Sequence, residues 1–254
     1  MRQVIIAAVI AAGALLFATA ASPATGSDPE PSRIPAASDV LPDIGMAHLG
    51  NFRVQYTGGK RLLRFDSVVV NTGPGRFEVR GSRPNSGAST MTVSQHVYNS
   101  SGGRRILPTD ATMYFGGDGH NHWHVRDLES FDLKRVKNSR ALRAGAKHGF
   151  CFYDNYRFGS RLSPYYTHCG DNTDLVVTMG LSRGWGDIYP YTLPDQYVDI
   201  TGLPDGRYRM VGTADEANWF RESNEANNIT SVNLKISGGS VRVLKYGPGA
   251  RPVS

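Results

Sequence analysis

From residue 41 onward, short runs of apolar and β-branched residues alternate with turn residues, and neither a helical spacing of apolar positions nor an internal repeat is found. Runs of this length, rich in Val, Ile, Phe and Tyr, are typical of β-strands. The predicted strands lie at residues 62–71, 76–80, 91–98, 122–133, 150–153, 196–200, 207–213 and 229–236. The pattern predicts an all-β fold, an antiparallel β-sandwich with long functional loops.

Turn sequences separate these runs, for example Asn-Thr-Gly-Pro-Gly at residues 71–75, Ser-Ser-Gly-Gly at 100–103 and Pro-Asp-Gly at 204–206. Gly, Pro and Asn adopt the backbone conformations that turns require. Residues 154–183 form a much longer connection. Because long plain loops are uncommon inside a compact domain, we expect this segment to be locally structured or functional.

The N-terminal segment has a different pattern. Arg2 precedes an apolar run at residues 4–21 that closes on small residues around Ala20, which is typical of a secretory signal peptide. An uncleaved N-terminal anchor is the alternative, because the run approaches the roughly 18 residues that span a membrane. We expect a signal peptide at residues 1–21, a flexible Pro/Ser-rich linker at 22–39, a folded domain at 40–246 and a C-terminal tail at 247–254. The mature protein is then secreted and extracellular, with no stable membrane insertion after cleavage.

Composition supports one substantial core in a globular chain, with 40% hydrophobic and 10% aromatic residues among 254. The formal net charge of +6 is spread along the chain, without a block of Lys and Arg. Nucleic acid is therefore not an expected partner. In an exported chain the two cysteines, Cys151 and Cys169, are expected to form one disulfide worth about 3 kcal/mol. Two free thiols are the alternative.

Three histidines recur at every second residue, His120, His122 and His124, so that on an extended strand their imidazoles share one face. Imidazole nitrogen suits copper, zinc, nickel or non-haem iron, and three such ligands leave a coordination position open for chemistry. A straight strand would separate the outer two by about 13 Å at Cα, so we expect Gly117 and Gly119 to allow a bend. The alternative is a hydrated run of histidines beside a buried tryptophan.

Several motifs in one order resemble the catalytic domain of the lysyl oxidase family, over roughly residues 41–236. The motifs are Leu-Leu-Arg-Phe at 62–65, the three alternating histidines, Lys-His-Gly-Phe-Cys-Phe-Tyr-Asp at 147–154, Gly-Trp-Gly-Asp-Ile-Tyr at 184–189, Val-Asp-Ile-Thr at 198–201 and Glu-Ser-Asn-Glu-Ala-Asn-Asn at 222–228. By this resemblance, residues 40–246 are a lysyl oxidase-like catalytic domain.

The resemblance implies a copper amine oxidase with His120, His122 and His124 as copper ligands. Its organic cofactor, lysine tyrosylquinone, is implied to form from Lys147 and Tyr189. Such an enzyme uses dioxygen to oxidise primary amines, either lysyl side chains of proteins or small amines, to aldehydes with release of ammonia and hydrogen peroxide. Lysine titrates near pH 10.4 in water, so Lys147 needs desolvation or nearby positive charge to present a neutral amine.

Some assignments stay open within this resemblance. Tyr191 and Tyr197 lie near Tyr189 in the sequence and are alternatives to it. The residue that removes the substrate α-proton is not identified, and the candidates are Asp127, Asp187, His148 and His168. Vertebrate members carry cysteines where this chain has Gly119 and Trp185, so the rigidity that those disulfides give must come from other contacts. They also carry a further histidine in the neighbourhood of Phe131, and any role of that histidine is absent or filled by another residue here.

A second metal site is implied near the C-terminal motif. Oxygen donors suit calcium rather than copper, and the family resemblance points to Asp43, the carbonyl of Ile44, and the side chains of Glu222, Asn224, Asn227 and Asn228. The alternative is a loop closed by its own Asn and Glu hydrogen bonds. For the protein as a whole, the alternative function is a non-catalytic copper-binding β-sandwich used for metal storage or surface interaction.

Overall fold

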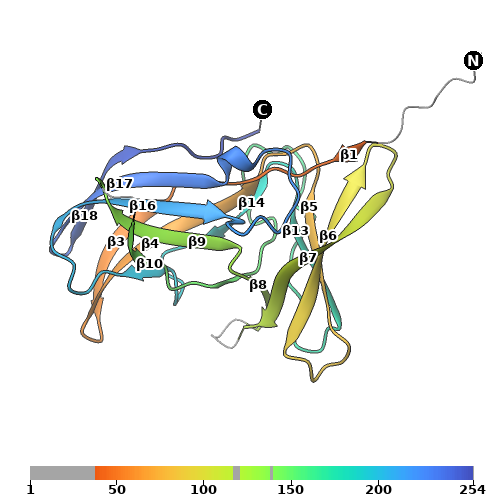
Figure 1. The fold of residues 1–254 in the computed structure, drawn as a ribbon, viewed down its shortest axis with the longest axis horizontal. Helices are drawn as coiled ribbons and strands as arrows, with labels where there is room; N and C mark the ends of the chain where they lie inside the picture. Colours follow the sequence, from red (N-terminus) through yellow and green to blue (C-terminus); the bar gives the residue numbers. More distant parts are fainter. Residues whose placement is uncertain (1–37, 117–120, 138–139, 254) are drawn as a thin grey trace, which may run out of the picture. The chain divides into compact units, whose positions relative to one another are not determined.

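The computed structural model describes residues 38–116, 121–137 and 140–253 (Figure 1). This part of the chain consists of β-strands with antiparallel pairing and a short 3-10 helix, η1 (Glu225–Asn227). The predicted all-β class and antiparallel sandwich are therefore confirmed. Within the described ranges, no helix has the length and apolar character needed to cross a bilayer.

The described strands form three sheets. The first has the order β11-β8-β7-β6-β5-β13, with β1 beside β6; its strands are β1 (Asp39–Val40), β5 (Phe77–Ser82), β6 (Thr90–Asn99), β7 (Arg104–Phe115), β8 (Trp123–Arg126), β11 (Gly149–Phe150) and β13 (Val176–Leu181). The second has the order β10-β9-β16-β17-β18; its strands are β9 (Glu129–Arg135), β10 (Ala141–Ala144), β16 (Gly206–Ala214), β17 (Ile229–Ser237) and β18 (Ser240–Tyr246).

The third sheet has the order β12-β14-β4-β15, and β2 and β3 also pair with β4. Its strands are β2 (Ile44–Met46), β3 (Gly50–Thr57), β4 (Lys60–Asn71), β12 (Tyr156–Arg157), β14 (Trp185–Tyr189) and β15 (Tyr197–Asp199). Strand β4 is buried along most of its length, as a strand covered on both faces should be. Figure 1 shows β16 and β17 lying over β3 and β4, which is the sandwich arrangement.

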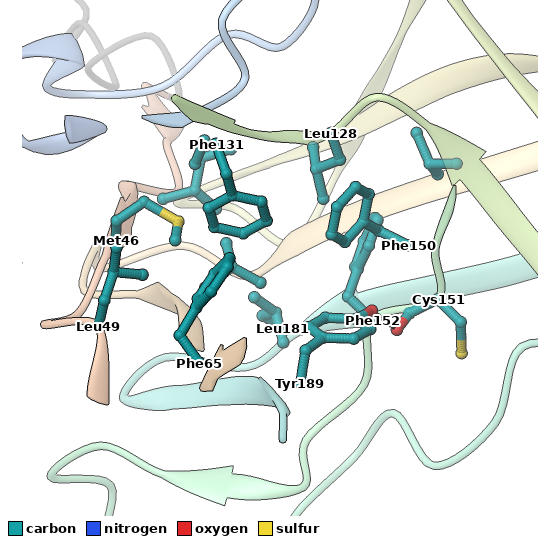
Figure 2. Close-up of a cluster of buried hydrophobic side chains, with 14 of the residues drawn as sticks. Met46, Leu49, Phe65, Leu128, Phe131, Phe150, Cys151, Phe152, Leu181 and Tyr189 are labelled. Atoms are coloured by element: carbon teal, nitrogen blue, oxygen red, sulfur yellow. Dashed lines mark hydrogen bonds between the residues drawn. The ribbon is translucent and has the colours of Figure 1, made fainter. Parts of the chain in front are cut away.

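The core runs between the sheets as a series of aromatic side chains (Figure 2). Phe65 on β4 meets Phe131 on β9 edge to face, with ring centres 4.9 Å apart. Phe131 approaches Phe150 on β11 at 6.5 Å, and Phe150 meets Tyr189 on β14 at 5.3 Å. The aromatic series therefore links the three sheets, and Tyr189 of the third sheet is in contact with Phe150 of the first.

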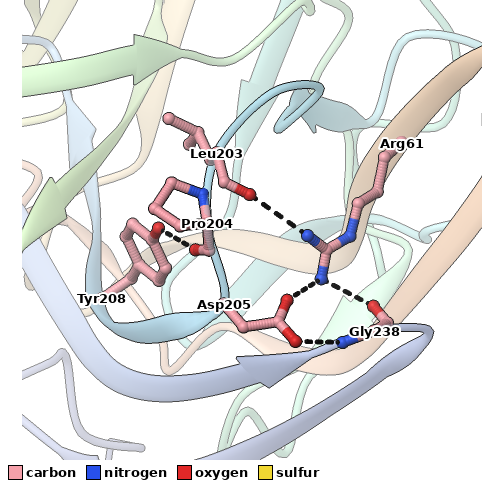
Figure 3. Close-up of polar contacts among 6 residues, drawn as sticks. All are labelled: Arg61, Leu203, Pro204, Asp205, Tyr208 and Gly238. Atoms are coloured by element: carbon pink, nitrogen blue, oxygen red, sulfur yellow. Dashed lines mark hydrogen bonds and ion pairs between the residues drawn. The ribbon is translucent and has the colours of Figure 1, made fainter.

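Arg61 on β4 connects the third sheet to loops of the second sheet (Figure 3). Its guanidinium donates to the carbonyls of Leu203 at 3.2 Å and Gly238 at 2.6 Å, and to the carboxylate of Asp205 at 2.8 Å. The amide of Gly238 donates to the same carboxylate at 2.7 Å. This planar donor set fixes the turn before β16 and the hairpin between β17 and β18.

The single strand predicted at residues 122–133 is wrong. Two strands occupy it: β8 belongs to the first sheet and β9 to the second. Asp127 between them has φ +52°, a left-handed conformation that redirects the backbone. The chain therefore crosses from one sheet to the other here, and the crossing brings the histidine segment next to the sandwich core.

The long segment at residues 154–183 is locally structured, as expected, since it contains β12 and β13. The predicted disulfide joins Cys151 to Cys169. The Asp154 carboxylate accepts hydrogen bonds from the amides of Tyr165 and Ser182, each at 2.8 Å. Asp154 thus joins the start of the segment to its middle, at Tyr165, and to its end, at Ser182, through side-chain hydrogen bonds.

Candidate active site

Lys147 and Tyr189, the two side chains expected to form the cofactor, lie in contact. Lys147 lies in the segment between β10 and β11, and Tyr189 ends β14. The Nζ atom of Lys147 is 4.8 Å from the centre of the Tyr189 ring. Each residue is only 6% exposed. The fold therefore brings an amine and a phenol together in a buried site.

Neighbouring groups fix this pair. Phe150 packs against both, 5.3 Å from Lys147 Nζ to its ring centre and 5.3 Å between the two aromatic ring centres. The hydroxyl of Tyr189 donates to the backbone carbonyl of Cys151. Strand β11, which carries Phe150, pairs with β8, and β14 pairs with β4. Each partner of the pair is thus anchored by a different sheet.

The alternative tyrosines lie elsewhere. The ring of Tyr191 faces Arg53 at 5.3 Å, and the ring of Tyr197 faces Arg64 at 5.5 Å. Both of these tyrosines are half-buried, and their arginines, Arg53 on β3 and Arg64 on β4, are opposite each other in the strand pairing. Of the three tyrosines considered from the sequence, Tyr189 is the one that the described structure places against Lys147.

Two buried carboxylates, Glu129 and Asp187, flank the amine and the phenol. Burial raises the pKa of Glu129 to about 8, and the positive charge of Lys147 lowers it in part. Burial also raises the pKa of Asp187 well above its usual range. The pKa of the Tyr189 phenol is raised by burial first and then by the charges of these two carboxylates. The phenol is accordingly un-ionised at neutral pH.

Glu129 was missed in the sequence, although a signal was available. It begins a strand whose other inward positions are Phe131 and Leu133, so a carboxylate stands where the alternation requires an apolar residue. Its Oε2 atom accepts a hydrogen bond from Ser67 Oγ at 3.1 Å, and Gln196 Nε2 donates to the same hydroxyl at 3.1 Å. A charged residue at an inward register is a candidate for function.

Glu129 should make stability depend on pH. With an unfolded pKa of 4.5 and a folded pKa of about 8, the folded state holds an extra proton between these values. Stability contributed by the protonated form is therefore complete below pH 4.5 and is lost as pH rises to about 8. We expect the stability difference between wild type and Glu129→Gln, from urea unfolding, to shift toward the variant over this range. A difference that does not change with pH would contradict the assignment. The titratable groups that face residue 129, which are Lys147, Asp187 and Tyr189, are the same in wild type and in Glu129→Gln.

Two of the three candidate copper ligands lie within the described residues. His124 is buried on β8 and His122 precedes that strand, so the strand begins later than expected. Their ring centres are 4.6 Å apart, which allows both imidazoles to reach one metal ion. His120, like Gly117 and Gly119, lies outside the described residues. In the described ranges alone, no group of three His, Cys, Asp or Glu side chains is arranged to hold a metal.

The lysine segment approaches the histidine strand closely at Gly149. A Cβ atom at this position would lie 2.0 Å from the hydroxyl of Tyr114 and 3.2 Å from Cβ of His124. Glycine therefore permits β11 to pair with β8, where Phe150 is opposite Val125. The motif that contains Lys147 and the motif that contains His124 are thus adjacent in space.

Two pockets open on the site. One, of about 350 Å³, is lined by His122, Asp187 and Tyr189 together with Cys151, Tyr153, Asn155, Ile188, Pro190 and Leu193. The other, of about 400 Å³, has Glu129 and Lys147 in its lining. His122 and Tyr189 therefore face one space, and Lys147 faces another.

The four candidate bases occupy different environments. Asp127 and His148 form an exposed pair at 2.7 Å, and His168 is exposed. Asp187 is buried two residues before Tyr189 on β14, so that both side chains lie on one face of the strand. Asp187 is therefore the candidate nearest the phenol. Phe131 is a buried core side chain, and Trp185 is buried under Arg157.

The residues expected to bind calcium also gather, around η1 and β2. Glu222 accepts from the amide of Ile44 at 2.6 Å and from Asn228 Nδ2 at 2.7 Å. Three buried oxygens of this group, the Oδ1 atoms of Asp43, Asn227 and Asn228, have no hydrogen-bond partner. Asn224 instead caps η1 by accepting from the amide of Ala226 at 3.1 Å. Burial raises the pKa of Glu222 to about 9. Uncompensated oxygens of this kind fit a hard cation.

Comparison with known proteins gives a consistent result. The family model described as lysyl oxidase matches residues 88–245, more than half of the chain. Lysyl oxidase homolog 2 of Homo sapiens is 28% identical over 183 residues, which cover 72% of this chain and 19% of that protein. Protein-lysine 6-oxidase of Gallus gallus is 28% identical over 120 residues, covering 47% of this chain and 27% of the relative. The matched region is thus a minor part of each relative. This chain belongs to the lysyl oxidase family.

Proposed function

We propose that this protein is a copper- and quinone-dependent amine oxidase that converts primary amines to aldehydes with release of ammonia and hydrogen peroxide. Its substrates are lysyl side chains or small primary amines, and its co-substrate is dioxygen. The observation that carries the proposal is the contact between Lys147 and Tyr189, with Nζ 4.8 Å from the ring centre in a buried site. Burial of the amine supports the proposal further, because an ordinary surface lysine keeps its charged end in water.

The donor groups fit the two components that this activity requires. His122 and His124, 4.6 Å apart, together with His120 would hold copper. Lys147 and Tyr189 would supply the atoms of lysine tyrosylquinone. When present, the metal and the quinone supply dioxygen-dependent oxidation and an electrophilic carbonyl for the amine.

The surrounding residues prepare the site for this chemistry. Phe150 and the burial of the pair exclude water from the space between the amine and the ring. The carbonyl of Cys151 orients the phenol by accepting its hydrogen bond. Asp187, beside Tyr189 in the same pocket as His122, is placed to receive a proton from an amine bound there.

A covalent link between the two precursor residues tests the proposal directly. Purified protein is loaded with copper(II) in air and digested, and the peptides are analysed by mass spectrometry. We expect a peptide that joins Lys147 to Tyr189, together with visible quinone absorbance and amine-dependent peroxide release. Copper binding without the linked peptide or peroxide would instead support the metal-binding module.

The proposal includes export, with residues 1–21 removed as a signal peptide, because a disulfide between Cys151 and Cys169 persists in oxidising compartments. It also includes a structural calcium held by Asp43, the carbonyl of Ile44, Glu222, Asn227 and Asn228, with Asn224 as a further oxygen donor. The three buried oxygens without partners support this site.

Calcium is expected to stabilise the fold. At a free calcium concentration of about a hundred times Kd, the added stability is about 2.7 kcal/mol, and the melting temperature rises by several degrees. Asp43→Ala should lose most of this increase, because Oδ1 of Asp43 would no longer contribute. Differential scanning calorimetry with calcium and with a chelator measures the effect, and Glu216→Gln, an exposed acidic position, is the control. An equal melting temperature with and without calcium would contradict the calcium site and would support the alternative, a loop closed by its own Asn and Glu hydrogen bonds.

A further inference from the structure

Glu129 is a buried carboxylate that the proposed chemistry has not yet used. It is 1% exposed, at the start of β9, and its inward neighbours on the strand are apolar. Burying a carboxylate is costly unless hydrogen bonds or charges compensate for it. Ser67 donates to Oε2, but Oε1 has no hydrogen-bond partner. A stable fold does not require this arrangement, so it calls for a functional explanation.

The position of Glu129 relates it to both cofactor precursors. Ser67, which holds its Oε2, is the residue directly opposite Tyr189 in the pairing of β4 with β14. Side chains of opposite residues lie about 5 Å apart at Cβ. Glu129 and Lys147 line the same pocket of about 400 Å³, and the two charges interact. Glu129 is therefore beside the tyrosine on one side and the lysine on the other.

The amine of Lys147 must lose a proton when its nitrogen forms a bond to a carbon atom. We propose, resting on the proposed function, that Glu129 accepts this proton as Lys147 Nζ bonds to the Tyr189 ring. The bond replaces one N–H bond of the amine and one C–H bond of the ring. The two electrons released pass to dioxygen, which also takes up two protons and becomes hydrogen peroxide. Glu129 holds the proton from Nζ and returns it to water in the pocket.

Two features make Glu129 the acceptor for this step. Its pKa, raised to about 8, lies near neutral pH, so the ionised form that accepts a proton is present in part at pH 7 and predominates above pH 8, and this form is a stronger base than an ordinary glutamate. The other groups nearby are less suited. Asp127 and His148 in the same pocket are paired with each other at the surface. Asp187 also has an unpartnered oxygen, Oδ2, but it lines the pocket of His122 and not the pocket of Lys147.

The rate of cross-link formation tests the assignment. Copper-free wild type, Glu129→Gln, Glu129→Asp and Asp132→Asn are mixed with copper(II) in air, and the Lys147–Tyr189 peptide is quantified over time by mass spectrometry. Asp132 is the matched control, because it lines the same pocket but is paired with Lys134 at 3.1 Å. Copper content and melting temperature are measured for each protein.

We expect the cross-link to form about a hundredfold more slowly in Glu129→Gln, at an intermediate rate in Glu129→Asp, and at the wild-type rate in Asp132→Asn. Copper content should be equal in all four. In Glu129→Ala, formate should restore the rate in proportion to its concentration, because a small carboxylate can enter the vacated space. A purely structural role for Glu129 would not produce this recovery.

The outcomes separate the two proposals. If the wild-type chain forms no cross-link, the proposed function fails, and the role of Glu129 fails with it. If the wild type forms the cross-link and Glu129→Gln forms it equally fast, only the role of Glu129 is overturned. A slow Glu129→Gln variant that neither aspartate nor formate improves would also overturn it, because Glu129 would then act through packing alone.

Discussion

Replacing Lys147 with alanine is expected to abolish amine-dependent hydrogen peroxide release and to leave copper binding unchanged. Lys147 is not among the proposed copper donors, so the proposed histidine site should retain its metal. Without the Nζ atom, however, the bond to Tyr189 cannot form, and the loss of activity should reach at least about a thousandfold, as for other covalent catalytic groups. Peroxide release with a primary amine, quinone absorbance and copper content are measured on the same preparations.

Lys134→Ala is the matched control for this substitution. Lys134 lies on β9 of the second sheet, where it pairs with Asp132 and is not in contact with Tyr189 in any described interaction. It should show wild-type peroxide release and a linked peptide. If Lys147→Ala retained full peroxide production, lysine tyrosylquinone could not be the cofactor, and a quinone derived from tyrosine alone, or a copper-only site, would have to replace it.

The fold class followed from the alternation of apolar and polar residues, but not every strand could be predicted in this way. Strand β7 (Arg104–Phe115) is exposed over most of its first half and lacks the hydrophobic signal on which strand prediction depends. Strand β3 (Gly50–Thr57) was missed although Phe52, Val54 and Tyr56 alternate with polar residues, because the run is short and largely exposed. Their pairing with buried strands, which the local sequence does not encode, holds them in the sheets.

The break between β8 and β9 was hidden for a different reason. Asp127 adopts a left-handed conformation without a glycine or proline to indicate it. Val125, Leu128, Phe131 and Leu133 are all buried, so the apolar pattern continues across the turn although the chain changes sheets. Tertiary packing therefore decided the boundary.

The members of the candidate site could be predicted only as far as motifs carried them. Lys147, Tyr189, His122 and His124 were identified from the order and spacing of short motifs, and the structure places Lys147 beside Tyr189 and His122 beside His124. Glu129, Ser67 and Phe150 come from three different strands and meet only in the folded chain. A single sequence does not show which distant residues meet. Glu129 alone could have been noticed, because it is a charged residue at an inward position of a predicted strand.

The final prediction concerns the metal, since it should control every later step. His122→Ala removes one of the two described imidazoles, which lie 4.6 Å apart. We expect copper affinity to fall by more than about a hundredfold, because the loss of groups that merely support a ligand already costs 10–100-fold. Without tightly bound copper, the linked peptide and peroxide release should both be absent. His148→Ala, an exposed histidine paired with Asp127, is the control and should retain copper. Isothermal titration with copper(II) and peptide mapping measure both effects. A His122→Ala protein that binds copper with wild-type affinity and still forms the Lys147–Tyr189 link would show that copper binds elsewhere.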